Sequence, residues 1–432
     1  MLEGEMTDWT DATAAAFLRG LFARAVEASQ PGARIPPLLP PAPAGRILVL
    51  GAGKAAVGMA RAVEDHYADF PRLSGLVITR HGLGGDGSLR RIALREAAHP
   101  VPDAAGIAAT AELLALTEGL GPDDLVIAVI SGGASALMVA PIAGLALEDK
   151  VELNRALLAS GATIAEMNCL RRHLSRVKGG RLAATCAPAR VVALLVSDVP
   201  GDDPAVIASG PCHADPTTVE DAKAVLRRLG LDLPRIAAAL DAEVAESVKP
   251  GDPRLDRVES HIVCSPQMAL EAAAEAARAE GLAVHVLGDA LEGEARETGR
   301  VLAGIARQIV LRNQPFARPC LLLSGGETTV SIRGPAGIGG RNVEFLLAYL
   351  LTARDLPGWA LAADTDGVDG AAEVAGAVGG AALLRAARAA GLDPAEALAG
   401  HDAHSFFAAL GAQVVTGPTG TNVNDFRAIL LP

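Results

Sequence analysis

Short, unbroken apolar runs alternate with helical patterns through the first half of this chain. The candidate strands are residues 46–50, 75–79, 125–130 and 191–196. The last of these, Val191–Val196, contains no polar residue. A strand that is apolar on both sides must be covered on both faces, as in a parallel sheet between helices. The pattern therefore predicts an α/β domain built on a parallel sheet.

The same alternation resumes beyond residue 250. A polar stretch that includes Pro250 and Pro253 interrupts it, and we place a domain boundary there. Further candidate strands follow at 261–264, 283–287, 319–323 and 359–363. We expect a larger N-terminal domain over residues 1–250 and a smaller α/β domain over 251–432. Two such domains usually hold a ligand in the cleft between them, near the carboxyl ends of strands.

The N-terminal region predicts a helix and no leader peptide. Apolar residues recur at helical spacing over residues 8–29, which indicates an amphipathic helix. Met1–Glu5 lacks the basic start of a signal peptide, and no apolar run approaches the length of a membrane span. The five cysteines are scattered without metal-site spacing, so we expect reduced, buried thiols and a cytoplasmic protein.

The composition limits the partners. Hydrophobic residues make up 50% of the chain and charged residues 20%, which is typical of a globular protein. The formal net charge of −12 argues against a nucleic-acid binder. An acidic protein that binds phosphates needs local clusters of cations. The oligomeric state stays open, with a homodimer as one option.

Lys54 occupies an unusual position in the turn Gly51-Ala52-Gly53-Lys54. An apolar strand precedes this turn and a helical pattern follows it. Glycines let backbone amides and a helix N-terminus approach an anion closely. The chain has 38 basic residues and only five are lysines, so a lysine here suggests a need for a compact point charge. The alternative is a dinucleotide-binding turn with an incidental lysine.

Two strands end in Ser-Gly-Gly, one in each expected domain. The segments are Ser131-Gly132-Gly133-Ala134-Ser135 and Ser324-Gly325-Gly326-Glu327-Thr328. Hydroxyls and glycine amides at the end of a strand can hold anionic oxygens. A tight turn is the alternative for either copy, and the repetition favours ligand contact.

Two further glycine-rich segments present cations. In Lys178-Gly179-Gly180-Arg181 the glycines would let backbone and cation reach one anion, whereas we expect several of the other charges in residues 168–182 to form a solvated helix face. The loop 334–342 brings Arg341 and Asn342 to the end of a glycine run. Arg341 could clamp a carboxylate or phosphate and close over substrate, or the loop could be a surface hairpin.

Carboxylates follow two of the strands. Asp198 comes directly after the 191–196 run, where it could hold Mg²⁺, accept a proton from a hydroxyl, or cap a turn. The segment Asp364–Gly370 is similar to the start of a calcium loop. It lacks the glutamate and the glycine that an EF-hand requires at fixed places, so we reject that interpretation.

Taken together in order, these segments resemble the glycerate 2-kinase family, whose C-terminal half is called the MOFRL domain. The matching strings are Gly51–Ala55, His99–Asp103, Ser131–Ser135, Arg172–Arg181, Ser197–Asp202, Ile207–Pro211, Ser324–Thr328, Gly339–Asn342, Asp366–Gly370 and Gly417–Asp425. They extend from about residue 10 to the C-terminus. Each string is weak, but the ordered set is specific.

The resemblance implies an ATP-dependent, Mg²⁺-requiring kinase that acts on D-glycerate, with a Rossmann-like N-terminal domain and a smaller C-terminal domain. It makes Lys54 and Arg341 the catalytic cations. The other expected contacts with ATP or D-glycerate are Gly51, Gly53, Ser131, Gly132, Gly133, Ser135, Lys178, Gly179, Arg181, Ser324, Gly325, Gly326, Asn342 and Asn422. Cys212, Val343 and Asp364 depart from the family pattern, which has threonine, glutamine and glycine there.

Our hypothesis is that Lys54 and Arg341 neutralise the transferred phosphoryl group, with product 2-phosphoglycerate. Asp198 or Glu327 would serve the metal or the attacking hydroxyl. One alternative is an NAD(P)-dependent hydroxypyruvate reductase, because Gly51-x-Gly53-x-x-Ala56 fits a loose dinucleotide fingerprint. The second strand ends in Thr79-Arg80 where NAD-dependent enzymes carry an acidic residue, although Arg80 could suit NADP. A metabolite-sensing binding protein that uses the same cleft is the non-enzymatic alternative.

Overall fold

The computed structural model describes residues 9–84, 89–332, 334–370 and 372–432. Met1–Glu5, on which the expectation about a leader peptide rests, lies outside these residues. Within the described part, no helix combines the length and the apolar character that a membrane crossing requires. All five cysteines are buried free thiols, as predicted.

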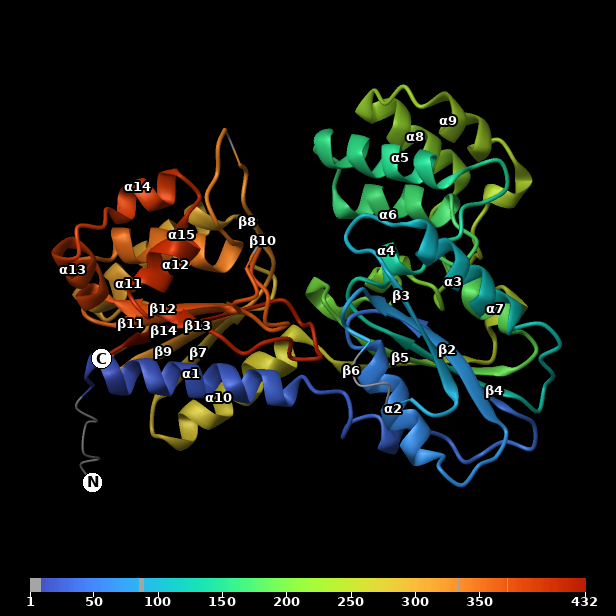
Figure 1. Ribbon diagram of the computed structural model, residues 1–432, viewed down its shortest axis with the longest axis horizontal. Helices are drawn as coiled ribbons and strands as arrows, with labels where there is room; N and C mark the ends of the chain where they lie inside the picture. The colour runs from blue at the N-terminus through green and yellow to red at the C-terminus, as the bar shows by residue number, and fades with distance from the viewer. Residues whose placement is uncertain (1–8, 85–88, 333, 371) are drawn as a thin grey trace. The chain divides into compact units, whose positions relative to one another are not determined.

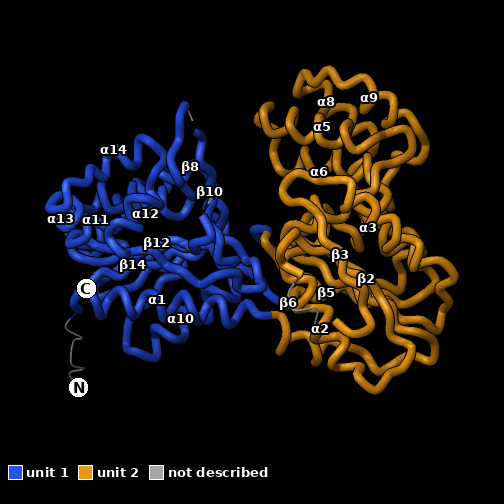
Figure 2. The backbone as a smooth tube through the Cα atoms, viewed as in Figure 1, with its two compact units in different colours: residues 1–30, 199–201, 264–432 blue, residues 31–198, 202–263 orange. Residues whose placement is uncertain are grey.

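The chain divides into two compact units, coloured separately in Figure 2. Unit 2 consists of residues 31–198 and 202–263, and unit 1 of residues 1–30, 199–201 and 264–432. Each unit contains its own six-stranded sheet.

The sheet of unit 2 has the strand order β3-β2-β1-β4-β5-β6. Its strands are β1 (Ile47–Ala52), β2 (Leu73–Arg80), β3 (Ile92–Ala97), β4 (Leu125–Ile130), β5 (Arg190–Val196) and β6 (Val258–Cys264). The pairings of β2 with β3, β1 with β2, β1 with β4, and β4 with β5 are all parallel. The predicted parallel sheet and its four predicted strands are confirmed.

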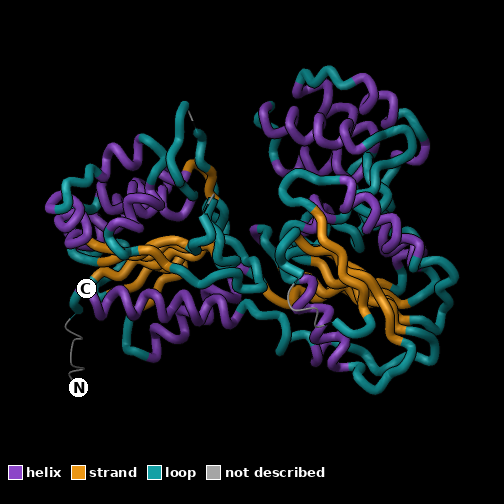
Figure 3. The backbone as a smooth tube through the Cα atoms, in the orientation of Figure 1, coloured by secondary structure: helices purple, strands orange, loops and turns teal. Residues whose placement is uncertain are grey.

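Every residue of β1 and β4 is buried, which explains their unbroken apolar sequences. The helices of unit 2 are α2 (Ala56–His66), α3 (Ala104–Ala115), α4 (Ala134–Leu137), α5 (Leu147–Ala159), α6 (Ile164–His173), α7 (Arg181–Cys186), α8 (Val219–Leu229) and α9 (Pro234–Leu240). Helices α5, α6, α8 and α9 form a separate helical group with its own apolar core, visible beside the sheet in Figure 3. Residues of α5 and α6 also line a pocket of unit 2.

The sheet of unit 1 is mixed, with the order β13-β12-β11-β14-β9-β7. Its strands are β7 (Ala283–Gly288), β9 (Cys320–Ser324), β11 (Trp359–Asp364), β12 (Gly376–Gly380), β13 (Gln413–Val414) and β14 (Asp425–Leu431). Only β7 and β9 pair in parallel, and the other neighbours are antiparallel. A two-stranded ribbon, β8 (Gly293–Glu294) with β10 (Thr328–Thr329), accompanies it.

Helices cover both faces of this second sheet (Figures 1 and 3). They are α1 (Asp11–Ala28), α10 (Pro266–Ala279), α11 (Ala295–Arg312), α12 (Arg341–Thr352), α13 (Ala381–Ala389), α14 (Pro394–Ala399) and α15 (Ala403–Ala409). The predicted amphipathic helix is α1, and its buried face includes Leu18, Leu21 and Phe22. Phe22 packs against Phe426 of β14 with ring centroids 5.7 Å apart.

This packing differs from the predicted domain boundary at residue 250 in two ways. Helix α1 belongs to unit 1, because its apolar face is covered by the C-terminal sheet and not by the sheet that follows it in sequence. Strand β6 neighbours β5 in the sheet of unit 2, although its residues 261–264 were assigned to the second domain. The sequence break at Pro250–Pro253 is therefore a turn within unit 2.

Candidate functional site

Three predicted segments meet at one edge of the unit 2 sheet. Lys54 follows β1, Ser131 follows β4, and Asp198 lies two residues after β5. These strands are adjacent and parallel, with Ala52 opposite Ile130 and Ile130 opposite Leu195. Between β1 and β4 the strand order reverses direction, which is where open α/β sheets bind ligands.

The Gly-x-Gly-Lys turn packs tightly on the loop that begins at Ser131. The Lys54 amide donates to the Gly132 carbonyl at 3.0 Å, and the Ala55 amide donates to Ser131 Oγ at 3.0 Å. Gly53 has φ +135°, and a Cβ there would lie 2.0 Å from Ser131 Oγ. Glycine is therefore required for contact between the two loops.

The amides of this turn are used inside the protein. Besides those of Lys54 and Ala55, the Gly53 amide donates to the Ile78 carbonyl at 3.0 Å and the Ala56 amide to the Gly53 carbonyl at 3.2 Å. These four amides are therefore unavailable to an anion, which contradicts the expectation for the backbone of this turn but not for the later amides at the start of α2. An anion at this turn would instead meet the Lys54 ammonium.

Lys178 lies beside the same loop. Its side chain is buried, and Nζ donates to the carbonyls of Ser135 at 2.8 Å and Met138 at 3.2 Å. Gly133, Ser135 and Lys178 all line one pocket of unit 2. The structure thus brings these three predicted residues together.

Gly179 and Arg181 serve the local fold instead. Arg181 Nη2 donates to the carbonyls of Val244 at 2.7 Å and Glu246 at 2.8 Å, so its guanidinium does not line the pocket. Gly179 has φ +57°, and a Cβ there would approach Arg172 Cβ to 3.2 Å. The paired glycines allow close packing, and they do not direct Arg181 to the anion that Lys178 could meet.

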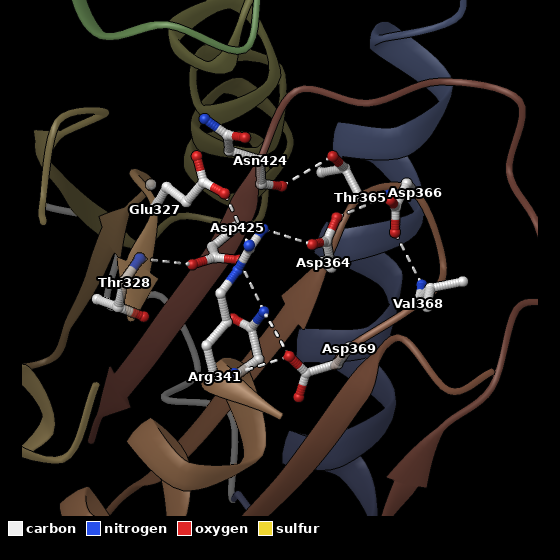
Figure 4. Close-up of polar contacts among 12 residues, drawn as sticks. Glu327, Thr328, Arg341, Asp364, Thr365, Asp366, Val368, Asp369, Asn424 and Asp425 are labelled. Carbon is white, nitrogen blue, oxygen red and sulfur yellow. Dashed lines mark hydrogen bonds and ion pairs between the residues drawn. The ribbon is translucent and has the colours of Figure 1, made fainter. Parts of the chain in front are cut away.

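Arg341 is surrounded by carboxylates of unit 1 (Figure 4). It is the first residue of α12, and its guanidinium reaches three different acids. Nε donates to Asp425 Oδ1 at 2.8 Å, Nη1 to Glu327 Oε1 at 2.8 Å, and Nη2 to Asp364 Oδ2 at 2.7 Å. Burial lowers the pKa of Arg341, but the three carboxylates together raise it well above its usual value. The guanidinium is permanently charged.

The start of α12 is held by Asp369. Its fully buried carboxylate accepts from the amides of Asn342 and Val343, each at 3.0 Å. A carboxylate at a helix N-terminus satisfies orphan amides and favours the helix dipole. The Asn342 side chain donates to Asp425 Oδ1 at 2.7 Å, so Asn342 orients the acid that binds Arg341.

The second Ser-Gly-Gly loop positions two members of this cluster. Gly326 has φ +109°, and a Cβ there would lie 2.3 Å from the Leu291 carbonyl oxygen. Beyond the glycines, Glu327 reaches Arg341 and the Thr328 amide donates to Asp425 Oδ2 at 3.4 Å. The Gly325 carbonyl accepts from Arg427 at 2.8 Å. Ser324 ends β9 and is buried.

Sequence reasoning missed Arg427, Asp369 and Asp425 as parts of this site. Arg427 is fully buried in β14, donates to Asp425 Oδ2 at 2.5 Å and lies over the Phe345 ring. Asp369 and Asp425 belong to two of the sequence segments that carry the family resemblance, and this membership is the feature from which they could have been predicted. Asp364, which stands where the family pattern has glycine, is one of the acids on Arg341.

Asn422 lies in the buried irregular segment that precedes β14. Its side-chain oxygen is buried and has no hydrogen-bond partner among the described residues. A buried acceptor without a partner costs free energy, which a ligand or a water could recover. Asn422 therefore stays a candidate ligand contact.

The two predicted metal ligands, Asp198 and Glu327, belong to different units. Among the described residues, no group of three or more histidine, cysteine, aspartate or glutamate side chains is arranged to hold a metal ion. A magnesium ion normally takes one or two protein carboxylates and fills its shell with water and substrate phosphates. Asp198 and Glu327 stay predictions.

Two family models match the chain. The domain of unknown function DUF4147 matches residues 17–241, and the MOFRL family matches residues 320–425. Together they span both units.

Curated relatives match over nearly the whole length. A protein of Agrobacterium vitis, provisionally named hydroxypyruvate reductase, is 50% identical over 98% of this chain and 96% of its own length. The D-glycerate 2-kinase of Thermotoga maritima is 38% identical over 93% of this chain and 94% of its own length. A crystal structure of glycerate kinase from Thermotoga maritima superposes with a TM-score of 0.87 at 35% identity, covering 98% of this chain and 100% of that one.

Proposed function

The chain belongs to the glycerate 2-kinase family, and we propose that it transfers the terminal phosphoryl group of ATP to the 2-hydroxyl of D-glycerate. The whole-length match to a D-glycerate 2-kinase carries this proposal. The placement of Lys54 at the strand-order reversal of unit 2 supports it, because a kinase needs a cation where the phosphates bind.

In this mechanism the protein mainly positions the substrates and compensates charge. Phosphoryl transfer spreads negative charge over the oxygens of the transferred group. The Lys54 ammonium would meet that charge, since the amides of residues 53–56 are already used. Arg341 would be the second cation in the same transfer. Phosphate oxygens would compete with its three carboxylate partners for the guanidinium, or bind the second N–H of Nη1 or Nη2.

Asp198 and Glu327 have separate tasks in the proposal. Asp198 is partly buried at the edge that carries Lys54, so it would accept the proton of the attacking hydroxyl. The side chain of Glu327 is 53% exposed beside Arg341 and presents hard carboxylate oxygens. Such oxygens fit Mg²⁺, which would neutralise charge on the phosphates when bound.

The alternative function is that of a hydroxypyruvate reductase, the name given to the Agrobacterium vitis relative. The strand order of unit 2 is also that of a dinucleotide-binding fold. Two observations bear on it: β2 ends in Arg80, which disfavours NAD but could suit the 2′-phosphate of NADP, and the amides of residues 53–56 are used inside the protein. The kinase interpretation uses the lysine that the reductase interpretation leaves without a role.

One pair of assays separates the two functions. Purified protein is supplied with ATP, Mg²⁺ and D-glycerate while ADP formation is followed, and separately with hydroxypyruvate and NADH or NADPH while absorbance is followed. We expect ADP release that depends on D-glycerate and no oxidation of the reduced nucleotide. Oxidation of NADH or NADPH without ADP release would overturn the proposal.

A further inference from the structure

Unit 2 contains a pocket of about 250 Å³ lined by cations and by no acid. We propose that this pocket binds the carboxylate of the three-carbon acid substrate and that Lys150 and Arg171, together with Lys178, are its specificity residues. The identity of the acid rests on the proposed function. The anion-binding character of the pocket rests on the structure alone.

The pocket lies between three parts of unit 2. Residues that precede α3 form one wall, the loop and short helix after β4 form another, and α5 with the α6 region forms the third. The lining residues are His99, Pro100, Pro102, Gly133, Ser135, Ala136, Val139, Ala140, Lys150, Asn154, Arg171, Ser175 and Lys178. All of them belong to the part of the chain that the structure describes.

The three cations contact oxygens that carry no formal charge. Lys178 Nζ donates to two carbonyls, at 2.8 and 3.2 Å. Lys150 Nζ donates to the Leu174 carbonyl at 3.4 Å, and Arg171 Nε donates to Asn154 Oδ1 at 3.4 Å. The last two contacts are long, so both groups could form better bonds with an anion.

This arrangement costs free energy while the pocket is empty. Lys150 and Lys178 are 7% and 3% exposed, and a buried cation without a counter-ion is strongly unfavourable. Burial, reinforced by Arg171, lowers the pKa of Lys150 to about 7. Burial also lowers the pKa of Lys178 well below its usual value, and repulsion from Lys150 and Arg171 adds to it. A bound anion would remove both penalties.

The size of the pocket selects a small anion. A volume of about 250 Å³ lies below the range of roughly 300–1,000 Å³ that is usual for drug-sized ligands. A three-carbon hydroxy acid fits this limit, whereas a complete adenine nucleotide is itself a drug-sized ligand.

Its location connects the pocket to Lys54. Gly133 and Ser135 line the pocket, and the same loop accepts the Lys54 amide at Gly132. With its carboxylate bound by Lys150 and Arg171, the acid would direct its hydroxyls toward this shared loop. Inorganic phosphate is the other small anion with matching chemistry, and the experiment includes it.

The test uses Lys150→Met and Arg171→Met in the full chain, with Arg176→Met as the matched control. Arg176 belongs to the same segment but is exposed and outside the pocket. Calorimetry measures the Kd of D-glycerate and of inorganic phosphate, and steady-state kinetics measures KM for D-glycerate and for ATP. We expect Arg171→Met to raise the Kd or KM of D-glycerate roughly 30-fold or more, with the KM of ATP unchanged. Phosphate should bind more weakly than D-glycerate.

A thermal melt distinguishes a binding role from a structural one. A lysine that is buried for binding destabilises the empty protein, so Lys150→Met should raise Tm without ligand and abolish the rise in Tm that D-glycerate produces. Unchanged Kd and KM in both variants would overturn the proposal, and so would a lower Tm of Lys150→Met with normal binding. Phosphate binding more tightly than D-glycerate would overturn the assignment to the carboxylate.

The outcome for the pocket is separable from the outcome for the proposed function. If the wild-type protein binds D-glycerate without phosphorylating it and the two variants do not bind it, the pocket proposal stands and the kinase proposal is refuted. If the wild-type protein phosphorylates D-glycerate and both variants have the same KM for it, the kinase proposal stands and the pocket proposal is refuted.

Discussion

The two Ser-Gly-Gly loops have similar sequences and opposite electrostatic surroundings. The loop after β4 in unit 2 adjoins Lys54 and a pocket that holds Lys150, Arg171 and Lys178 without any acid. The loop after β9 in unit 1 carries Glu327, and the arginine beside it is bound by three carboxylates. The same turn thus serves a site with excess positive charge and a site in which the cation is already paired.

The comparison shows that the Ser-Gly-Gly motif determines how closely the backbone can pack, and not the charge of the site. Glycines permit close contact at both loops. A Cβ at Gly53, in the turn that packs on the loop after β4, would overlap Ser131 Oγ, and a Cβ at Gly326, in the loop after β9, would overlap the Leu291 carbonyl oxygen. The charge around each loop comes from side chains that are distant in sequence. The unit 2 pocket has cations without a facing acid, whereas an anion at Arg341 in unit 1 would compete with three carboxylates.

The largest expected effect is on turnover through unit 2. Lys54→Met removes a cation that the proposed mechanism uses in the transition state, so kcat should fall about 10³-fold. Lys223→Met is the control, because Lys223 pairs with Glu220 and Asp241 on the surface. A folded Lys54→Met protein with kcat within tenfold of wild type would remove Lys54 from the mechanism.

Arg341→Lys is the corresponding test in unit 1. It keeps the charge but cannot reach three carboxylates at once, because an ammonium lacks the planar fork of a guanidinium. We expect kcat to fall about 10²-fold, with a lower Tm. Circular dichroism at the assay temperature would show that the fold persists. Wild-type kcat combined with a lower Tm would assign Arg341 a structural role only.

The pH dependence of the KM of D-glycerate tests whether the cations of the unit 2 pocket bind the substrate. The pKa of Lys150 is about 7, and an anion favours the protonated form of this lysine, so proton binding and anion binding are linked. The KM of D-glycerate should be flat below about pH 7 and rise above it, by at most tenfold per pH unit. Lys178, Arg171 and His99 face the same pocket, so the profile of Lys150→Met isolates the contribution of Lys150. A wild-type KM that is constant through this range would contradict the prediction.

The smallest expected effect concerns Arg181. Its two hydrogen bonds to carbonyls predict that Arg181→Ala lowers the free energy of unfolding by about 1–2 kcal/mol while leaving the KM of D-glycerate unchanged. Urea unfolding with fluorescence detection gives the first quantity. A raised KM at normal stability would restore Arg181 as a ligand contact.

Strands β4 and β14 show what the sequence does and does not predict. Leu125–Ile130 was predicted residue for residue, because every side chain in it is apolar and buried. Strand β14 was missed, although all its residues are buried, because it contains Asp425 and Arg427. These two charges compensate each other, and such a pair becomes visible only when the partners are placed in space.

Prediction of the site residues was limited in the same way, because contacts between distant segments cannot be seen in the sequence. Motifs predicted Lys54, Ser131, Lys178 and Arg341, since glycine turns and strand ends have sequence signatures. Arg171 was not singled out among the charges of residues 168–182, because its pocket neighbours Lys150 and Asn154 belong to a different helix. The use of the turn amides was also unpredictable, since it depends on the loop that packs against them.

The most direct test of the central claim is the ³¹P spectrum of the product formed from D-glycerate, ATP and Mg²⁺. Phosphorylation at the 2-hydroxyl predicts a new phosphomonoester signal split into a doublet by the single hydrogen on carbon 2. A triplet would place the phosphate on the 3-hydroxyl and contradict the site of transfer. The absence of any new phosphomonoester signal from active, folded protein would contradict the kinase itself.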